Sequence, residues 1–348
     1  TLINDGILHT LMMVALVRSV SNISKQIAAH AMLNMLRDET LLSKVLDVGV
    51  IGAFASLSAV KCTRLRNICA KGFLRISCIE KGRIALCQRR NVLHALFSLL
   101  KSGKQSKMTI LVGTTVCNVL FGDSTRKLAV DAGALSVLKV IATTEFEELR
   151  ESTARVIMIL VDDKWLQSRL INEPVVSILV YVLEDAKDST WSLECAVKAF
   201  SCFAKQAIFR STLIEKGCIA AFVGAIINGR VTTITVAEEI CRCLCLLSYE
   251  NELVGIMLSN HILVALYCIY KGNLCDSACA NMMAITLRNL SGNIEIIHRP
   301  LDINGRPETG RNRDTFEKLS VPATRLEVKA CESIVKQEGF RVLGWILR

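Results

Sequence analysis

The chain has 348 residues, carries a net charge of +10, and is 51% hydrophobic. Only 5% of its residues are aromatic and four are proline, whereas a globular enzyme of this size usually has more of both. Abundant aliphatic residues with few prolines favour helices packed on helices. The longest uncharged run, Leu253 to Tyr270, is interrupted by Ser259, Asn260 and His261. We therefore expect buried helices and no membrane span.

The fifteen cysteines are scattered among apolar stretches, and no two of them form a C-x-x-C pair. In the closest group, Cys241 and Cys245 share one face of a helix and Cys243 points away. We expect these residues to be small buried hydrophobes in a reducing compartment. The spacing predicts neither disulfides nor a metal site, and no motif calls for a cofactor.

One phrase recurs along the chain: a turn-forming residue, an apolar helix, a polar gap and a second helix. It recurs at intervals of 41 to 44 residues, beginning at Gly6, Gly49, Asn91, Gly133, Pro174, Gly217 and His261. Glycine suits a sharp turn between helices because it adopts positive φ without steric cost. Asn91 is an acceptable substitute, while Pro174 and His261 predict a different turn geometry in units five and seven.

Each unit then closes with a longer helix, of which Ala284-Ile-Thr-Leu-Arg-Asn-Leu is the clearest example. The period of about 42 residues and this closing phrase resemble armadillo repeats, over roughly residues 1 to 298. The resemblance implies an all-α, right-handed superhelical solenoid of about seven repeats. Each unit needs its neighbours because it exposes apolar residues on more than one face.

The resemblance also implies a concave groove lined by the third helices, in which an asparagine of each repeat binds the backbone of an extended peptide. The aligned positions are Asn34, Arg75, Asn118, Ile159, Cys202, Leu246 and Asn289. One helical turn earlier lie His30, Lys71, Thr114, Arg155, Lys198, Arg242 and Ile285. Three of seven in the first row are asparagine, and four of seven in the second are Lys or Arg.

Import receptors of the importin-α type place tryptophan in the second row, and none of Trp165, Trp191 and Trp345 falls there. The basic row is more similar to that of β-catenin, whose groove receives acidic extended segments. We therefore expect a scaffold that binds an extended, acidic protein segment through Asn34, Asn118, Asn289, Lys71, Arg75, Arg155, Lys198, Arg242 and His30. The alternative is that these cations are solvated surface residues and that the asparagines cap or cross-link neighbouring helices.

Catalytic motifs are absent: the sequence has no phosphate-binding glycine loop, no H-E-x-x-H and no G-x-S-x-G. Acid pairs such as Asp162-Asp163 fall at turns between helices, where N-caps are common. We expect no enzyme activity. Two other functions stay open, a structural component of a ciliary or trafficking assembly, and nucleic-acid binding, against which the scarcity of aromatic residues argues.

The residue composition of the chain changes after Ile297. Residues 299–325 are expected to form a basic flexible loop, since they contain three of the four prolines and several arginines. Residues 326–348 are expected to form a helical segment, either a partial repeat or a cap. Because the first residue is Thr1 and residues 1–10 lack a polar cap, we expect the chain to be a fragment. A cytoplasmic location is expected, with nuclear or ciliary locations as alternatives.

Overall fold

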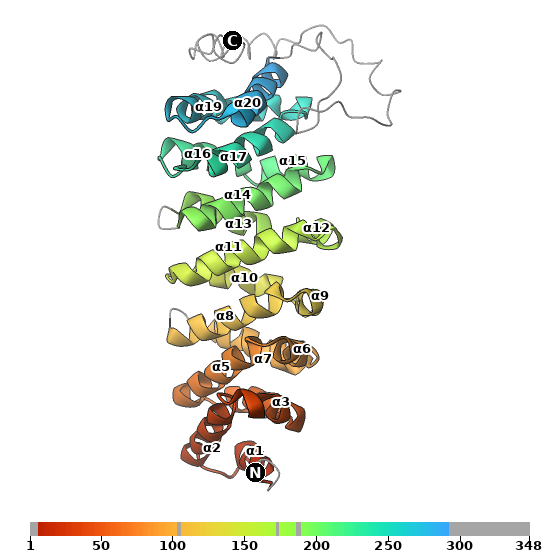
Figure 1. Cartoon of the computed structure of the whole chain (residues 1–348), viewed down its shortest axis with the longest axis vertical. Helices are drawn as coiled ribbons and strands as arrows, with labels where there is room; N and C mark the ends of the chain where they lie inside the picture. Colours follow the sequence, from red (N-terminus) through yellow and green to blue (C-terminus); the bar gives the residue numbers. More distant parts are fainter. Residues whose placement is uncertain (1–5, 103–105, 172–173, 186–188, 292–348) are drawn as a thin grey trace. The chain divides into compact units, whose positions relative to one another are not determined.

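The computed structural model describes residues 6–102, 106–171, 174–185 and 189–291, and no strand occurs in these ranges. The predicted loop at 299–325 and the predicted helical segment at 326–348 lie outside the described residues. The chain divides into two compact units, Thr1–Ile178 and Leu179–Arg348, with the boundary inside one helix. Each unit is a stack of helices (Figure 1).

The helices fall into three classes that alternate along the chain, which we name the first, second and third helices. The first helices are short: α3 (Glu39–Val48), α6 (Glu80–Cys87), α9 (Asp123–Asp131), α12 (Lys164–Leu170), α15 (Ala207–Glu215) and α18 (Val254–Ser259), the last preceded by the 3-10 turn η1 (Asn251–Leu253). The second helices are α1 (Ile7–Leu16), α4 (Val50–Ser58), α7 (Arg90–Ser102), α10 (Leu135–Ala142), α13 (Val175–Glu184), α16 (Cys218–Ile227) and α19 (Ile262–Lys271). The third helices are α2 (Asn22–Met35), α5 (Thr63–Ser77), α8 (Lys107–Phe121), α11 (Glu147–Asp162), α14 (Thr190–Ala204), α17 (Ile234–Leu247) and α20 (Ser277–Leu290).

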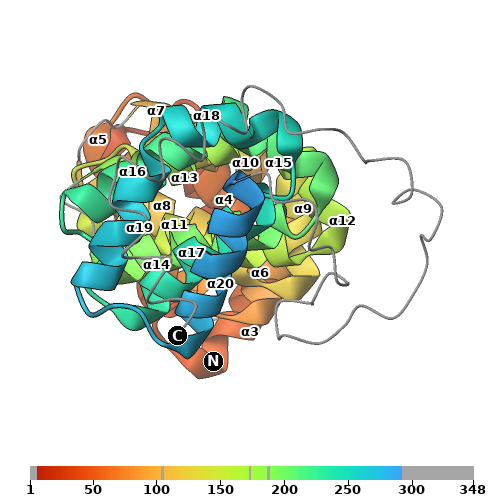
Figure 2. The same ribbon diagram turned by 90° about the horizontal axis from the view of Figure 1, so that it is seen from above.

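Helices of the same class pack against one another from repeat to repeat. In the first unit α2, α5, α8 and α11 follow one another as direct neighbours, and α1, α4, α7 and α10 do the same. In the second unit α14 packs on α17 and α17 on α20, while α16 packs on α19 (Figure 2). The core of each unit lies between these layers and is built of aliphatic side chains with a few phenylalanines, such as Phe54, Phe73, Phe200 and Phe222. Stacking buries the faces that a single repeat would leave exposed.

The turns before the second helices have the predicted geometry at four glycines. The φ angles of Gly6, Gly49, Gly133 and Gly217 are 74°, 100°, 91° and 86°. The prediction for unit seven is wrong, because His261 keeps the same left-handed turn with φ of 60°. This conformation is costly for a residue that has a β-carbon, yet it forms here without glycine.

The two remaining repeats without a turn glycine, units three and five, differ from each other. Asn91 does not replace the turn glycine, because it lies within the first turn of α7 rather than in a left-handed turn. Pro174 departs as predicted, since its ring holds φ negative.

Polar caps determine where several third helices begin. The side chains of Ser21, Ser189, Thr233 and Asp276 each accept a hydrogen bond from the backbone N–H three residues later. These caps satisfy N–H groups that have no partner within the helix. Asp163 caps α12 in the same way, accepting from the N–H of Trp165 at 3.0 Å, as expected for an acidic residue at a turn between helices.

Within the described ranges, no single helix is long and apolar enough to cross a membrane. Two bent pairs of helices meet the length and composition requirement together: Leu41–Val48 with Val50–Ser58, and Asn251–Ser259 with Ile262–Lys271.

Candidate binding surface on the third helices

The predicted site residues all lie on third helices. In the first unit they are His30 and Asn34 on α2, Lys71 and Arg75 on α5, Asn118 on α8, and Arg155 on α11. In the second unit they are Lys198 on α14, Arg242 on α17 and Asn289 on α20. We call the half-buried and exposed positions of these rows the third-helix surface of each unit.

Two of the three asparagines bond to the preceding third helix. The Asn118 amide donates to the Ser77 hydroxyl at 3.0 Å, and the Asn289 amide donates to the Ser248 hydroxyl at 3.0 Å. Both asparagines are half-buried, whereas Asn34 is exposed. The cross-linking role that the sequence left as an alternative is therefore present at Asn118 and Asn289. It leaves each amide its oxygen and a second N–H for a ligand.

Arg75 also contacts the neighbouring helix. Its Nε donates to the carbonyl oxygen of Leu36 at 3.3 Å and its Nη2 to that of Arg37 at 3.4 Å. These carbonyls follow the last residue of α2, where helix geometry leaves acceptors without partners. The side chain of Arg75 is thus engaged in closing the end of α2.

The cations of the basic row in the first unit are open to solvent. His30, Lys71 and Arg155 are exposed. The guanidinium of Arg155 lies 5.2 Å from the centroid of the Phe121 ring on α8, a cation–π contact that leaves its charge in place. Among the described residues, no carboxylate lies within ion-pair distance of Lys71 or Arg155. The α5 helix therefore presents an unpaired cation at Lys71, and α11 presents one at Arg155, although Glu151 lies one helical turn before Arg155 without forming an ion pair with it.

The same row in the second unit is neutralised. Nζ of Lys198 lies 2.6 Å from Glu194, one helical turn earlier, and the hydrogen bond to this carboxylate raises the pKa of Lys198. Arg242 lies 2.7 Å from Glu238 and 3.6 Å from Glu239. These carboxylates were missed in the sequence, although the i, i+4 spacing of Glu194 to Lys198 and of Glu238 to Arg242 is a local signal for such pairs.

Many basic side chains hold helix ends. In four repeats, a first-helix side chain donates to the carbonyl oxygen six residues earlier, at the end of the third helix: Arg83 to Ser77 at 3.2 Å, Arg126 to Leu120 at 3.3 Å, Gln167 to Val161 at 2.6 Å and Arg210 to Ala204 at 2.8 Å. Two third-helix arginines do the same for the preceding second helix, Arg66 to Val60 at 3.1 Å and Arg150 to Thr144 at 2.8 Å. Part of the net positive charge therefore belongs to side chains that cap helix ends.

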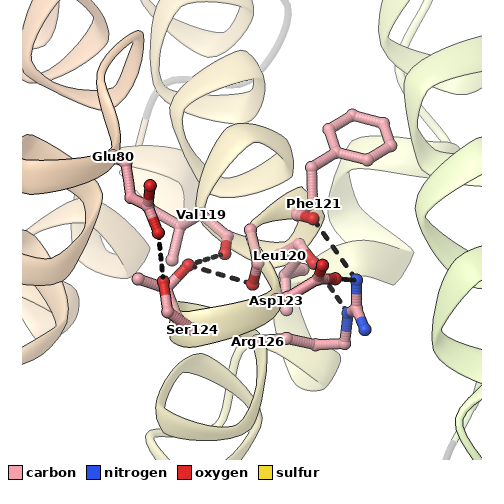
Figure 3. A network of polar contacts seen from close by, with 9 residues as sticks. Glu80, Val119, Leu120, Phe121, Asp123, Ser124 and Arg126 are labelled. Carbon is pink, nitrogen blue, oxygen red and sulfur yellow. Dashed lines mark hydrogen bonds and ion pairs between the residues drawn. The ribbon is translucent and has the colours of Figure 1, made fainter.

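Figure 3 shows one such joint, between α8 and α9. Arg126 also donates to the carbonyl oxygen of Phe121 at 3.3 Å and pairs with Asp123 at 2.6 Å. Ser124 donates to Glu80 of α6 at 3.3 Å and so links two successive first helices. This group of side chains fixes a corner of the repeat through hydrogen bonds among its own members, while the Asp123 carboxylate stays exposed to solvent.

Most of the buried cysteines have unreactive thiols. Burial raises the pKa of Cys87 to about 11 and that of Cys117 to about 12, so both are protonated at neutral pH. Burial likewise raises the pKa of Cys69 and of Cys218. In the part of the chain that the structure describes, no group of three or more His, Cys, Asp or Glu is arranged to hold a metal ion.

Repeats of three helices stacked like on like define an α-solenoid, and comparison with solved structures shows which kind. A crystallised engineered protein superposes with a TM-score of 0.58 at 18% identity, over 99% of this chain and 84% of its own. A computationally designed armadillo repeat protein for modular peptide recognition gives 0.55 at 18% identity, over 69% of this chain and 99% of its own. A designed armadillo repeat protein in complex with the peptide (KR)4 gives 0.54 at 18% identity, over 69% and 99%.

The chain therefore has the armadillo-repeat fold, as the sequence predicted. The sequence matches no protein-family model and no curated protein. At 18% identity the structural likeness concerns the fold alone.

Proposed function

We propose that this chain is a non-enzymatic protein-binding scaffold, and that the third-helix surface of its first unit receives an acidic, extended segment of a partner. The observation that carries the proposal is the contrast between the two halves of the basic row. Among the residues that the structure describes, no carboxylate is in ion-pair contact with the exposed cations Lys71 and Arg155, although Glu151 lies one turn before Arg155. Lys198 and Arg242, in contrast, are paired with glutamates of their own helices.

The geometry of the first unit suits an extended ligand. Lys71 is on α5 and Arg155 is on α11, and both helices pack directly against α8, which lies between them in the stack. A segment crossing these helices would meet one cation on each side and Asn118 between them. The Asn118 amide offers both a donor and an acceptor to a peptide backbone beyond its bond to Ser77. The partner's charge differs from that of the (KR)4 peptide bound by the designed neighbour.

Each contact at such a surface is weak, so the affinity would depend on several together. An exposed ion pair contributes about 0.2–1 kcal/mol. Losing two of them is expected to weaken binding by about two- to thirtyfold. Raising the ionic strength should have a similar effect, because salt screens charges at a solvated surface.

The matched variants are Lys71→Gln with Arg155→Gln in the first unit, and Lys198→Gln with Arg242→Gln in the second. The probe is a fluorescent peptide of alternating Glu and Gly, with a Gln and Gly peptide as its neutral counterpart, measured by anisotropy at two salt concentrations. We expect the first pair to weaken binding of the acidic peptide and the second pair to leave it nearly unchanged. Thermal melting of each variant checks that the fold is intact.

Three results would overturn the proposal: equal loss from both double variants, no preference for the acidic over the neutral peptide, or tighter binding of a single-stranded oligonucleotide through Lys71 and Arg155. The last result would make a nucleic acid the ligand of this surface. Binding of oligonucleotides would also show a steeper dependence on salt.

A further inference from the structure

Four sulfur atoms gather where α17 packs against α20 in the second unit. The sulfur atoms of Cys241 and Cys279 are 3.2 Å apart. The sulfur atom of Met283 lies 3.7 Å from that of Cys275 and 4.0 Å from that of Cys279. Cys275 precedes α20 and is half-buried, whereas Cys241 and Cys279 are buried. Three thiols at different depths therefore share one site on two neighbouring helices.

The distance between Cys241 and Cys279 is short for two unbonded thiols on different helices. A disulfide requires about 2.05 Å between the sulfur atoms, so they would have to approach by about 1 Å. The 3.2 Å separation already places the two sulfur atoms in contact between the packed helices α17 and α20, so this approach needs no exchange of neighbouring helices. By contrast, the thiol of Cys78 on the first unit is exposed and donates to the carbonyl oxygen of Leu74.

The same contacts separate the acidities of the three thiols. Hydrogen bonding to Cys241 lowers the pKa of Cys279, and Cys275 adds to this effect, while burial opposes it. The contact with Cys279, together with burial, raises the pKa of Cys241. Burial raises the pKa of Cys275 to about 12. The thiolate is the reactive form of cysteine, and the contact with Cys241 favours this form at Cys279.

We propose that Cys241 and Cys279 are a redox-active pair that a hydroperoxide converts into a disulfide linking α17 to α20, with Cys275 as the thiol that exchanges into the bond. Cys279 is in the first turn of α20, and its backbone N–H donates to the Asp276 cap at 2.7 Å, so exposing its sulfur atom requires this turn to open locally. Such an opening would admit a small oxidant to a sulfur atom that is otherwise covered. The inference is independent of the peptide-binding surface proposed for the first unit.

Oxidation of the two thiols by hydrogen peroxide takes two steps. The Cys279 thiolate attacks one oxygen of hydrogen peroxide, the O–O bond breaks, and the departing hydroxide takes a proton to become water, leaving a sulfenic acid. The Cys241 sulfur then attacks the Cys279 sulfur, the S–S bond forms, the S–O bond breaks, and the hydroxyl leaves as water with the proton of the Cys241 thiol. Two thiols lose two electrons in total, and one peroxide is reduced to two waters.

The half-buried Cys275 offers a route by which an external reductant can reach the disulfide. Attack of the Cys275 sulfur on Cys279 would form a Cys275–Cys279 bond and release Cys241, whose sulfur takes the proton from Cys275. This exchange is slow at neutral pH, because burial keeps Cys275 protonated. This second disulfide lies nearer the surface and within one segment of the chain. An external thiol can therefore reduce it more readily than the buried bond between the two helices.

The test treats the whole chain with stoichiometric hydrogen peroxide, blocks free thiols with iodoacetamide, and identifies linked peptides by mass spectrometry without reductant. We expect a Cys241–Cys279 link that dithiothreitol reverses, and a higher melting temperature for the oxidised chain. Recovery of both cysteines as alkylated thiols, or their oxidation to sulfinic acid without a link, would overturn the proposal.

Three variants separate the roles. Cys279→Ser should abolish the link and the rise in melting temperature, and Cys78→Ser, which removes an exposed thiol elsewhere, should change neither. Cys275→Ser should keep the link but slow its reduction by dithiothreitol. A rise in melting temperature that persists in Cys279→Ser would contradict the assignment. If that variant melts early even when reduced, the link mapped in the unmodified chain still decides the question.

Discussion

The amide nitrogen of Asn118 on α8 lies 3.0 Å from the hydroxyl oxygen of Ser77, at the end of α5. The pair Asn289 and Ser248 repeats the contact at 3.0 Å between α20 and the end of α17. In both pairs the serine hydroxyl also donates to a carbonyl of its own helix. The asparagine position therefore joins successive repeats, whatever else it binds.

Asn118→Ala is expected to destabilise the first unit by about 1 kcal/mol, the usual net contribution of one hydrogen bond. A double-mutant cycle with Ser77→Ala should give a coupling energy of about 0.5–1.5 kcal/mol. Hydrogen exchange in α5 and α8 is the suitable measurement, because repeat arrays open locally rather than as one body. Asn34→Ala, at the exposed equivalent position, is the control and should change nothing measurable. A coupling energy near zero would contradict the joining role.

Arg126→Met should weaken the joint between α8 and α9 by about 1–3 kcal/mol, because it leaves the carbonyls of Leu120 and Phe121 without their donor. The side chain of Arg126 is 13% exposed, while that of Asp123 is 93% exposed. Asp123→Asn should therefore have little effect, since the carboxylate of this ion pair is almost fully solvated. Urea unfolding followed by circular dichroism compares the two. Equal losses in both variants would mean that the ion pair, not the carbonyl capping, holds the joint.

His261→Gly should stabilise the second unit by up to about 1 kcal/mol. The left-handed conformation costs a residue with a β-carbon about 1–2 kcal/mol, and the extra backbone entropy of glycine offsets part of the gain. Gly217→Ala tests the converse at the equivalent turn, where φ is 86° and no atom lies within 4 Å of an added β-carbon. That change should destabilise by about 1–2 kcal/mol through the backbone alone. Melting temperatures that move in the same direction for both variants would refute the argument.

Gly82→Ala should be the most damaging of these single changes, costing about 3 kcal/mol or more. A β-carbon at Gly82 in α6 would lie 2.0 Å from the carbonyl oxygen of Ile76 in α5, a contact that only backbone movement can relieve. The loss should appear as faster hydrogen exchange in α5 and α6. An alanine variant with unchanged exchange in both helices would show that the two can separate without cost.

Sequence alone determined the fold of this protein, because the signals that define a repeat are local. The 41- to 44-residue period, the turn glycines and the long closing helices depend on residues near one another in the chain. The ion pairs of Lys198 and Arg242 follow a local i, i+4 spacing that we did not use, but Glu151 and Arg155 share this spacing without pairing, so the spacing permits such a pair and does not decide it. The turn at His261 shows the limit of such rules, since the same left-handed turn forms there although the residue is not glycine.

Only the tertiary structure decided which polar groups meet. Ser77 and Asn118 are 41 residues apart, and Cys241 and Cys279 are 38 apart, so their contacts depend on how one third helix is seated on the next. The same seating separates the exposed Lys71 from Arg75, which closes the end of α2. A periodic pattern specifies which face of a helix is buried, but the partner of each polar atom follows from the rotation and spacing of packed helices.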